Sequence, residues 1–241
     1  MKSMKPKKPF TMEDFEKGLM LLGYILPSSE QELKELEALE QFEKEQAIER
    51  QQTHFRRVVL AAEIVGKLYS EPTMGRVKFQ KLVYLCEYAA EMELAHRYQK
   101  QAAGPFDHKF MHSVHLEFKK LKWFETKIVT SGDYKRTVYQ PMSNVEGYKG
   151  YYNSYFGQLD DSIQHVIQLF RKQSTEKTEL AATVHYCLCE LEANGHPITL
   201  AALIKLFYDW SKAKSKFSEQ DVLESARWLK QNGLTDIEVS K

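Results

Sequence analysis

The chain has 241 residues, which is enough for one large domain or two small ones. Its 34 Lys and Arg nearly balance its 33 Asp and Glu, and the formal net charge of +1 excludes a uniformly basic nucleic-acid-binding protein. Hydrophobic residues make up 43% and aromatic residues 12%, which excludes an acidic disordered chain. Eleven Gly and seven Pro are few, so we expect long helices with short connections rather than a β-barrel or a Gly-rich nucleotide-binding fold.

The cysteines and the hydropathy pattern indicate the compartment. Cys187 and Cys189 are one residue too close for the C-x-x-C spacing of metal and redox sites, and Cys86 stands alone. Three reduced cysteines are typical of a cytoplasmic protein. The longest apolar stretch, residues 18–27, is too short to cross a bilayer, and the basic start lacks the core of a signal peptide. We therefore predict a soluble cytoplasmic protein.

Residues 1–54 form an N-terminal segment in which an apolar strip precedes an acidic stretch. Ser29 and Glu32 have the spacing of a capping box, which predicts a helix that begins at Glu30. From residue 30 to residue 50 eight Glu stand against three cations, a net charge of −5. We interpret this stretch as a solvated helix, or as one that lies against a basic partner.

The apolar residues of this acidic helix do not form a coiled-coil seam. Leu33, Leu36 and Leu39 recur every three residues, so the row turns by about 60° around the helix at each step. Glu40 and Glu43 occupy the next positions that a heptad seam would need. The strip at 18–26 is too apolar to stay exposed without cost, at roughly 25 cal/mol per Å². We therefore expect the N-terminal segment to contact a partner.

Residues 55–145 are predicted to form a helical core with a hairpin. The first helix begins near Phe55, where a new apolar stripe starts, and a second runs from Phe79 to about Ala95. A turn spans residues 101–107, and Asp107 caps a third helix. Segments 123–130 and 134–140 alternate around Ser-Gly-Asp, which is typical of a hairpin. Three helices followed by a hairpin is the order of a winged-helix unit.

Residues 146–241 are predicted to form a C-terminal helical part that packs on this core. A tyrosine-rich stretch at 148–155 keeps helical spacing and is interpreted as core rather than as a platform for stacking bases. Four helices follow, with predicted caps at Thr199 and Ser218 and helix-ending Asn-Gly pairs at 194–195 and 232–233. The predicted fold class is therefore mainly α, winged-helix-like, with one β-hairpin and an acidic N-terminal helix.

The third helix carries a basic face. His108, His112 and His115 share that face with Lys119 and Lys122. The three imidazoles could share a metal ion, but no carboxylate or Cys lies with them, so we predict no metal site. The same face in a recognition helix would contact phosphates or an acidic protein. A solvated face without a ligand is the third interpretation.

Charge is uneven along the chain despite the small total. Residues 96–123 have a net charge of +4 and residues 205–216 a net charge of +3. These clusters could contact phosphates, dock an acidic partner, or be covered by the acidic helix. Because the sequence contains no nucleophile elbow, P-loop, dinucleotide fingerprint or zinc-peptidase motif, we predict a non-catalytic protein with no cofactor.

Two segments resemble a known family. Residues 76–86 (RVKFQKLVYLC) and 98–110 (YQKQAAGPFDHKF) resemble the SocA-like, or Panacea, antitoxin domain, in which a K-x-x-K-L-x-Y helix precedes a Y-G-P turn. Lys78, Lys81, Leu82 and Tyr84 match the helix, whereas Ala103 replaces the aromatic residue of the turn. Residues 101–107, 118–124 (FKKLKWF) and 226–234 (ARWLKQNGL) are also similar to a tail domain of type I restriction-modification proteins.

The Panacea resemblance implies a non-catalytic protein that binds and neutralises a toxin. Our leading hypothesis is an antitoxin-like or adaptor-like regulatory protein that binds a partner protein through an exposed edge, comprising Arg76, Lys78, Lys81, Gln101, Phe106 and Asp107. The restriction resemblance implies an accessory module near DNA. The alternative is therefore a winged-helix nucleic-acid-binding protein of a restriction or defence system, which would use His112, His115, Lys119, Lys122, Lys127, Lys135 and Arg136.

Overall fold

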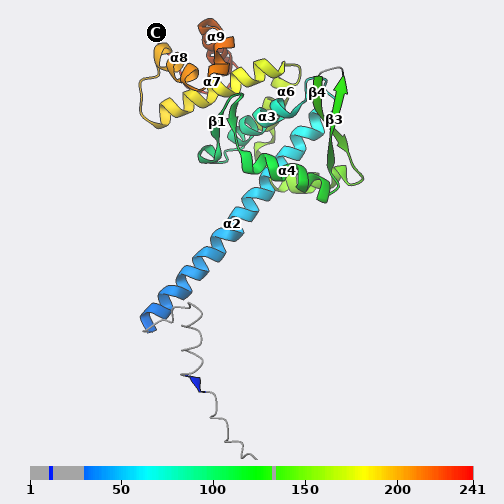
Figure 1. Ribbon diagram of the computed structural model, residues 1–241, viewed down its shortest axis with the longest axis vertical. Helices are drawn as coiled ribbons and strands as arrows, with labels where there is room; N and C mark the ends of the chain where they lie inside the picture. The colour runs from blue at the N-terminus through cyan, green and yellow to red at the C-terminus, as the bar shows by residue number, and fades with distance from the viewer. Residues whose placement is uncertain (1–10, 13–29, 132–133, 241) are drawn as a thin grey trace, which may run out of the picture. The chain divides into compact units, whose positions relative to one another are not determined.

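The computed structural model describes residues 11–12, 30–131 and 134–240 and is mainly α-helical (Figure 1). The chain divides into two compact units, with the boundary between Gln52 and Thr53. The second unit contains both the predicted core domain and the predicted C-terminal part. The helices are α2 (Glu30–Leu68), α3 (Arg76–Ala89), α4 (His108–Lys120), α5 (Lys149–Phe156), α6 (Asp160–Phe170), α7 (Thr175–Ala193), α8 (Leu200–Asp209) and α9 (Glu219–Gln231).

Two antiparallel hairpins accompany these helices. The predicted hairpin is present as β3 (Phe124–Ser131) and β4 (Tyr134–Pro141), and the centre of its turn lies outside the described residues. A second, shorter hairpin pairs β1 (Gln99–Gln101) with β2 (Gly104–Phe106). The sequence predicted only a turn there. A mainly α fold with a β-hairpin is thus confirmed.

Helix α2 is longer than either helix predicted in its place. The change of apolar register near Phe55 was expected to separate two helices, but α2 continues from Glu30 to Leu68. No Gly or Pro interrupts the sequence between residues 30 and 65, so nothing breaks the backbone hydrogen bonding. The register change instead marks a change of environment: residues 30–52 are exposed, whereas most residues from Arg57 onward are buried. The predicted cap at Ser29 lies outside the described residues.

Helix α3 ends earlier than predicted, at Ala89 rather than near Ala95. Glu91 adopts a left-handed backbone conformation (φ 53°), and its N–H binds the carbonyl of Tyr88. A short 3-10 helix (Ala95–Arg97) then leads into β1. The predicted caps of the later helices are confirmed, because Asp107 caps α4, Thr199 caps α8 and Ser218 forms a capping box at α9.

One hydrophobic core joins the helices of the second unit. The C-terminal part of α2 contributes Val58 and Val65, α3 contributes Phe79, and α7 contributes Val184. Helix α7 packs against α3, α8 and α9, and Figure 1 shows it crossing between them. Of the tyrosine-rich stretch, the core takes up Tyr148 and Tyr152, whereas Tyr151 and Tyr155 stay at least one-third exposed, so the core interpretation is confirmed for the first pair.

No helix within residues 30–131 or 134–240 combines the length and the apolar character needed to cross a bilayer.

Candidate functional site

The surface between α4 and the β3–β4 hairpin brings predicted site residues together. A groove of about 370 Å³ lies there, and we call it the basic groove. It combines two residues of the predicted protein-binding edge with three of the predicted nucleic-acid-binding residues. Among the described residues that line it none is a carboxylate. They are Arg76, Phe106, His108, Met111, His112, His115, Thr126, Lys127, Ile128 and Thr137.

His115 lies in this groove as a largely buried ring. Its ring stacks on Phe79, with centroids 5.7 Å apart, and its Nε2 lies 3.4 Å from the hydroxyl of Tyr139. Burial lowers the pKa of His115 to about 4, because the charged imidazolium loses its hydration. At neutral pH this side chain is therefore an uncharged part of the groove wall.

Of the remaining predicted phosphate contacts, His112 and Lys127 line the groove, whereas Lys119, Lys122, Lys135 and Arg136 are not among its lining residues. His112, Lys119, Lys122 and Lys135 are exposed. Glu125 compensates part of this charge, since it lies 4.0 Å from Lys119 and 3.4 Å from Lys127. Arg136 differs from our prediction, because its Nη1 donates a hydrogen bond to the carbonyl of Pro72. That contact ties the hairpin to the loop before α3 and leaves only part of the guanidinium for a ligand.

Lys78, which was predicted to lie on the exposed edge, is fully buried. Its Nζ donates to Thr73 Oγ1 at 2.6 Å and to the carbonyls of Arg171 and Gln173 at 3.1 and 2.8 Å. Burial lowers the pKa of Lys78 to about 8. The prediction of an exposed position is wrong because the ammonium binds the carbonyl of Arg171 at the end of α6 and that of Gln173 in the segment before α7.

Lys81 is likewise inside the protein. Its Nζ donates to the carbonyl of Pro105 at 2.6 Å, and burial with the nearby Lys214 lowers its pKa to about 7. Gly104 lies against both α3 and α7, with φ at +100°, and a Cβ there would come within 2.6 Å of Thr183 Oγ1. Lys81 and Gly104 therefore hold this turn against the core, whereas Lys78 ties α3 to the segment that follows α6.

Asp107 is the third predicted edge residue that is buried. One carboxylate oxygen caps α4 through the N–H of Phe110, and the other accepts from Arg57 Nη1 at 2.7 Å. Arg57 also donates to Glu87 at 2.7 and 3.2 Å, and Glu87 accepts from the hydroxyl of Tyr98. Burial raises the pKa of Glu87 despite this pairing. We name this set the Arg57 network, and it joins α2, α3 and α4.

Only half of the predicted edge is therefore accessible. Arg76 and Gln101 are exposed and Phe106 is half-buried. Gln101 lies away from the groove lining, and its carbonyl accepts a hydrogen bond from the indole of Trp210 at 2.7 Å. Arg76 and Phe106 remain together in the basic groove. The three histidines of α4 do not form a metal-binding group with any described side chain.

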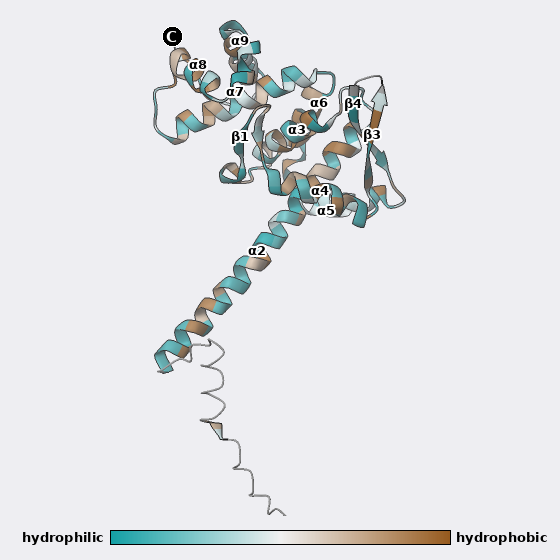
Figure 2. Ribbon diagram, in the orientation of Figure 1, coloured by the Kyte–Doolittle hydropathy of each residue, from teal (hydrophilic) through white to brown (hydrophobic). Residues whose placement is uncertain are grey.

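A second candidate surface lies on the exposed part of α2. Every residue from 30 to 52 is exposed, and the hydropathy colouring of the ribbon shows hydrophobic residues interspersed among hydrophilic ones along this helix (Figure 2). Ion pairs within the helix join Lys34 to Glu30 at 2.7 Å and Lys44 to Glu40 at 3.5 Å. The exposed fractions of the large apolar residues are Leu33 46%, Leu36 46%, Leu39 59%, Phe42 57% and Ile48 55%.

One face of this helix combines apolar and acidic side chains. At about 100° per residue, Leu36, Leu39, Glu40 and Glu43 fall within one sector of about 100°. We call these four residues the acidic face. On an isolated helix such a face is open to solvent, and large apolar residues in it are unfavourable unless a partner covers them.

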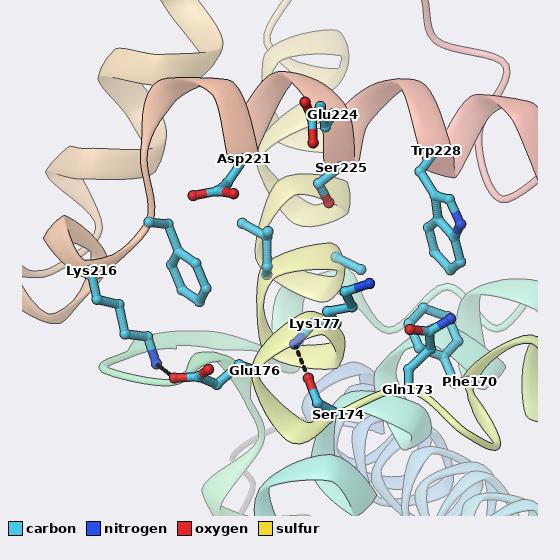
Figure 3. Close-up of a pocket in the computed structure, with 13 residues that line it drawn as sticks. Phe170, Gln173, Ser174, Glu176, Lys177, Lys216, Asp221, Glu224, Ser225 and Trp228 are labelled. Atoms are coloured by element: carbon cyan, nitrogen blue, oxygen red, sulfur yellow. Dashed lines mark hydrogen bonds and ion pairs between the residues drawn. The ribbon is translucent and has the colours of Figure 1, made fainter.

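Another cavity, of about 530 Å³, contains none of the predicted site residues. It lies between α7 and α9 (Figure 3). Phe170 and Trp228 close one end, and Lys216 paired with Glu176 lies at the other. Its wall is divided between apolar and polar residues, and Asp221 is already engaged in the cap of α9. Long-range packing creates it, so no sequence motif marks it.

A Cys–His pair on α7 is not arranged as an activated nucleophile. His185 Nε2 donates to the carbonyl of Leu234 at 3.1 Å, so Nδ1 accepts from the hydroxyl of Tyr84 at 2.8 Å. Cys189 Sγ lies 3.7 Å from the same Nδ1. Burial raises the pKa of Cys189 to about 11 and lowers that of His185 to about 4, so both stay neutral at pH 7. All three cysteines are free.

Comparisons with known proteins assign neither a family nor a function to this chain. No protein-family model matches the chain. A search of curated protein sequences finds no significant match either. Function is therefore argued from the acidic face and the basic groove.

Proposed function

We propose that this chain is a non-catalytic interaction protein, of the antitoxin or adaptor type, that binds a partner protein through the exposed part of α2. One observation carries the proposal: five large apolar side chains, each 46–59% exposed, lie on a helical stretch whose net charge is −5. Exposed apolar groups gathered on one element are typical of protein-binding surfaces. The resemblance of residues 76–110 to the Panacea domain is what points to a toxin or a regulated protein as the partner.

The chemistry of the helix limits the partner. A groove that accepts Leu36 and Leu39 needs an apolar floor, as in other complexes that bind an amphipathic helix. Glu40 and Glu43 beside them favour a basic rim, which speeds association and selects the partner. The proposal therefore expects a cytoplasmic protein with an apolar, basic-rimmed groove.

Affinity capture with paired variants tests this proposal. Leu36→Ser with Leu39→Ser removes apolar contact area from the acidic face. Gln31→Ser with Gln41→Ser is the matched control, because it puts two serines on another face of the same helix without changing the charge. A leucine at the centre of an interface contributes about 1–2 kcal/mol, so the leucine variant should lose the partner by roughly tenfold or more in affinity.

The expected result is a defined partner that co-purifies from the native host with the wild type and with the glutamine variant, but not with the leucine variant. Circular dichroism should show the same helix content in all three proteins. The proposal fails if no stoichiometric partner appears, or if the leucine variant retains it.

A second candidate function rests on a different observation. Residues 108–140 carry six Lys and one Arg against three carboxylates, a net charge of +4, and α4 lies next to a hairpin as a recognition helix does. We propose nucleic-acid binding by the basic groove as the alternative function. Its test is the affinity for duplex DNA at increasing salt, which should fall steeply and weaken further in Lys119→Gln with Lys127→Gln. Absence of binding at low salt would exclude it.

A further inference from the structure

The acidic face and the basic groove have complementary chemistry. We propose that the acidic face of one copy docks into the basic groove of a second copy, which produces a symmetric homodimer. The inference rests on the proposed function, in which the exposed part of α2 is a protein-binding element, and names one occupant for it. Both elements are present in every chain, so each partner in the dimer supplies one helix and one groove.

The apolar parts of the two surfaces match. The apolar lining of the groove that a ligand can reach consists of Ile128, which is 72% exposed, and the half-buried Phe106, whereas Met111 is only 5% exposed. Leu36 and Leu39 lie about 4.5 Å apart along the helix axis, less than one helical turn, so both can enter one short groove. Their insertion would cover apolar surface on both copies that is otherwise in water.

The charges match as well. Arg76 and Lys127 lie at the groove, and no described lining residue carries a negative charge. Glu40 and Glu43 flank the leucines of the acidic face. Lys127 pairs with Glu125 at 3.4 Å, and Glu40 pairs with Lys44 at 3.5 Å. Both are weak surface pairs that can be exchanged for contacts across the interface.

The symmetry doubles the contact. A stable protein–protein interface buries roughly 1,200–2,000 Å² in total, which is large for a single helix face. Two identical helix-in-groove contacts, related by one twofold axis, would each need to bury only half of that area. Because the groove is also the nucleic-acid-binding candidate, the dimer and a nucleic acid would compete for the same residues.

Charge reversal in the full-length protein tests this inference. The helix variant carries Glu40→Lys and Glu43→Lys, and the groove variant carries Arg76→Glu and Lys127→Glu. All four positions are exposed, so both variants should fold, and circular dichroism with thermal unfolding checks this. Analytical ultracentrifugation then measures the mass of each protein alone and of the equimolar mixture.

The expected results form one pattern. The wild type is a dimer whose dissociation constant rises at least about tenfold between about 0.1 and about 0.5 M NaCl. Each variant alone is a monomer, because like charges then meet at the interface. The mixture forms a heterodimer, because the reversed helix meets the reversed groove and the two native surfaces meet each other.

Three outcomes would overturn the inference: a wild type that is monomeric at every salt concentration, folded variants that remain dimers, or a mixture that does not pair. The proposed function is tested separately. If the wild type is a monomer but the host partner is still lost in the leucine variant, the inference falls and the proposed function stands.

Discussion

Replacing Arg57 with Met should strongly destabilise the protein. Arg57 is 1% exposed and donates three hydrogen bonds to Glu87 and Asp107, which are themselves 1% and 5% exposed. Methionine fills much of the same volume but leaves two buried carboxylates without their cation. Breaking a buried ion pair in this way costs about 3–5 kcal/mol.

The neighbouring residue provides the control. Arg56 is partly buried, and its guanidinium lies 5.9 and 5.6 Å from the rings of Tyr155 and Phe156. Such cation–π contacts contribute about 0.5–1 kcal/mol, so Arg56→Met should cost about 1 kcal/mol or less. The two variants make the same chemical change at adjacent positions of α2, and they differ in whether a buried network depends on it.

Urea unfolding followed by circular dichroism measures both costs. With a urea dependence of about 2–3 kcal/mol per M, Arg57→Met should lower the midpoint by at least about 1 M. Adding Glu87→Gln should recover part of that loss, because it removes one of the uncompensated charges and keeps an acceptor for Tyr98. The reasoning is refuted if Arg57→Met costs no more than Arg56→Met, or if the second substitution adds to the damage.

Two further predictions concern the turn and the buried His185. Gly104→Ala should lower the free energy of unfolding by about 2–5 kcal/mol, because φ is positive there and a Cβ would come within 2.6 Å of Thr183 Oγ1. The control is Gly195→Ala, which also has a positive φ but open space around it, and it should cost about 1–2 kcal/mol in the same assay. Equal costs would contradict the proposed close contact. Burial depresses the pKa of His185 from 6.5 to about 4. The contribution of the neutral ring to the free energy of unfolding is therefore complete above pH 6.5, and about 3 kcal/mol of it is lost as the pH falls towards 4. Unfolding curves between pH 7 and 4 should show a smaller loss for His185→Gln than for the wild type, and an identical loss would refute this assignment.

Local signals explain what the sequence could predict. The caps at Asp107, Thr199 and Ser218 depend on residues three positions apart, and the β3–β4 hairpin joins two neighbouring segments that pair over eight residues. Such patterns are complete within one segment of chain. Strands β1 and β2 have only three residues each, which is too short for an alternation to be recognised.

The errors have a common physical origin. Lysines are rarely buried, so Lys78 and Lys81 were placed on the surface, although distant carbonyls of Arg171, Gln173 and Pro105 hold them inside. Those partners lie 24 to 95 residues away along the chain, and helical spacing carries no information about them. Arg57 directly precedes the uninterrupted apolar run at residues 58–62, and this position is the sequence signal of a buried charge.

Photo-crosslinking from the acidic face tests the central claim most directly. A photoreactive amino acid replaces Leu36 in the host cell, and the same group at Gln41, on another face of the helix, is the control. We predict a defined protein adduct from position 36 and little from position 41; an adduct with groove residues of a second copy would identify the homodimer, and one with another protein would identify the partner. No adduct from position 36, or equal labelling from both positions, would contradict the claim that this face of α2 binds a protein.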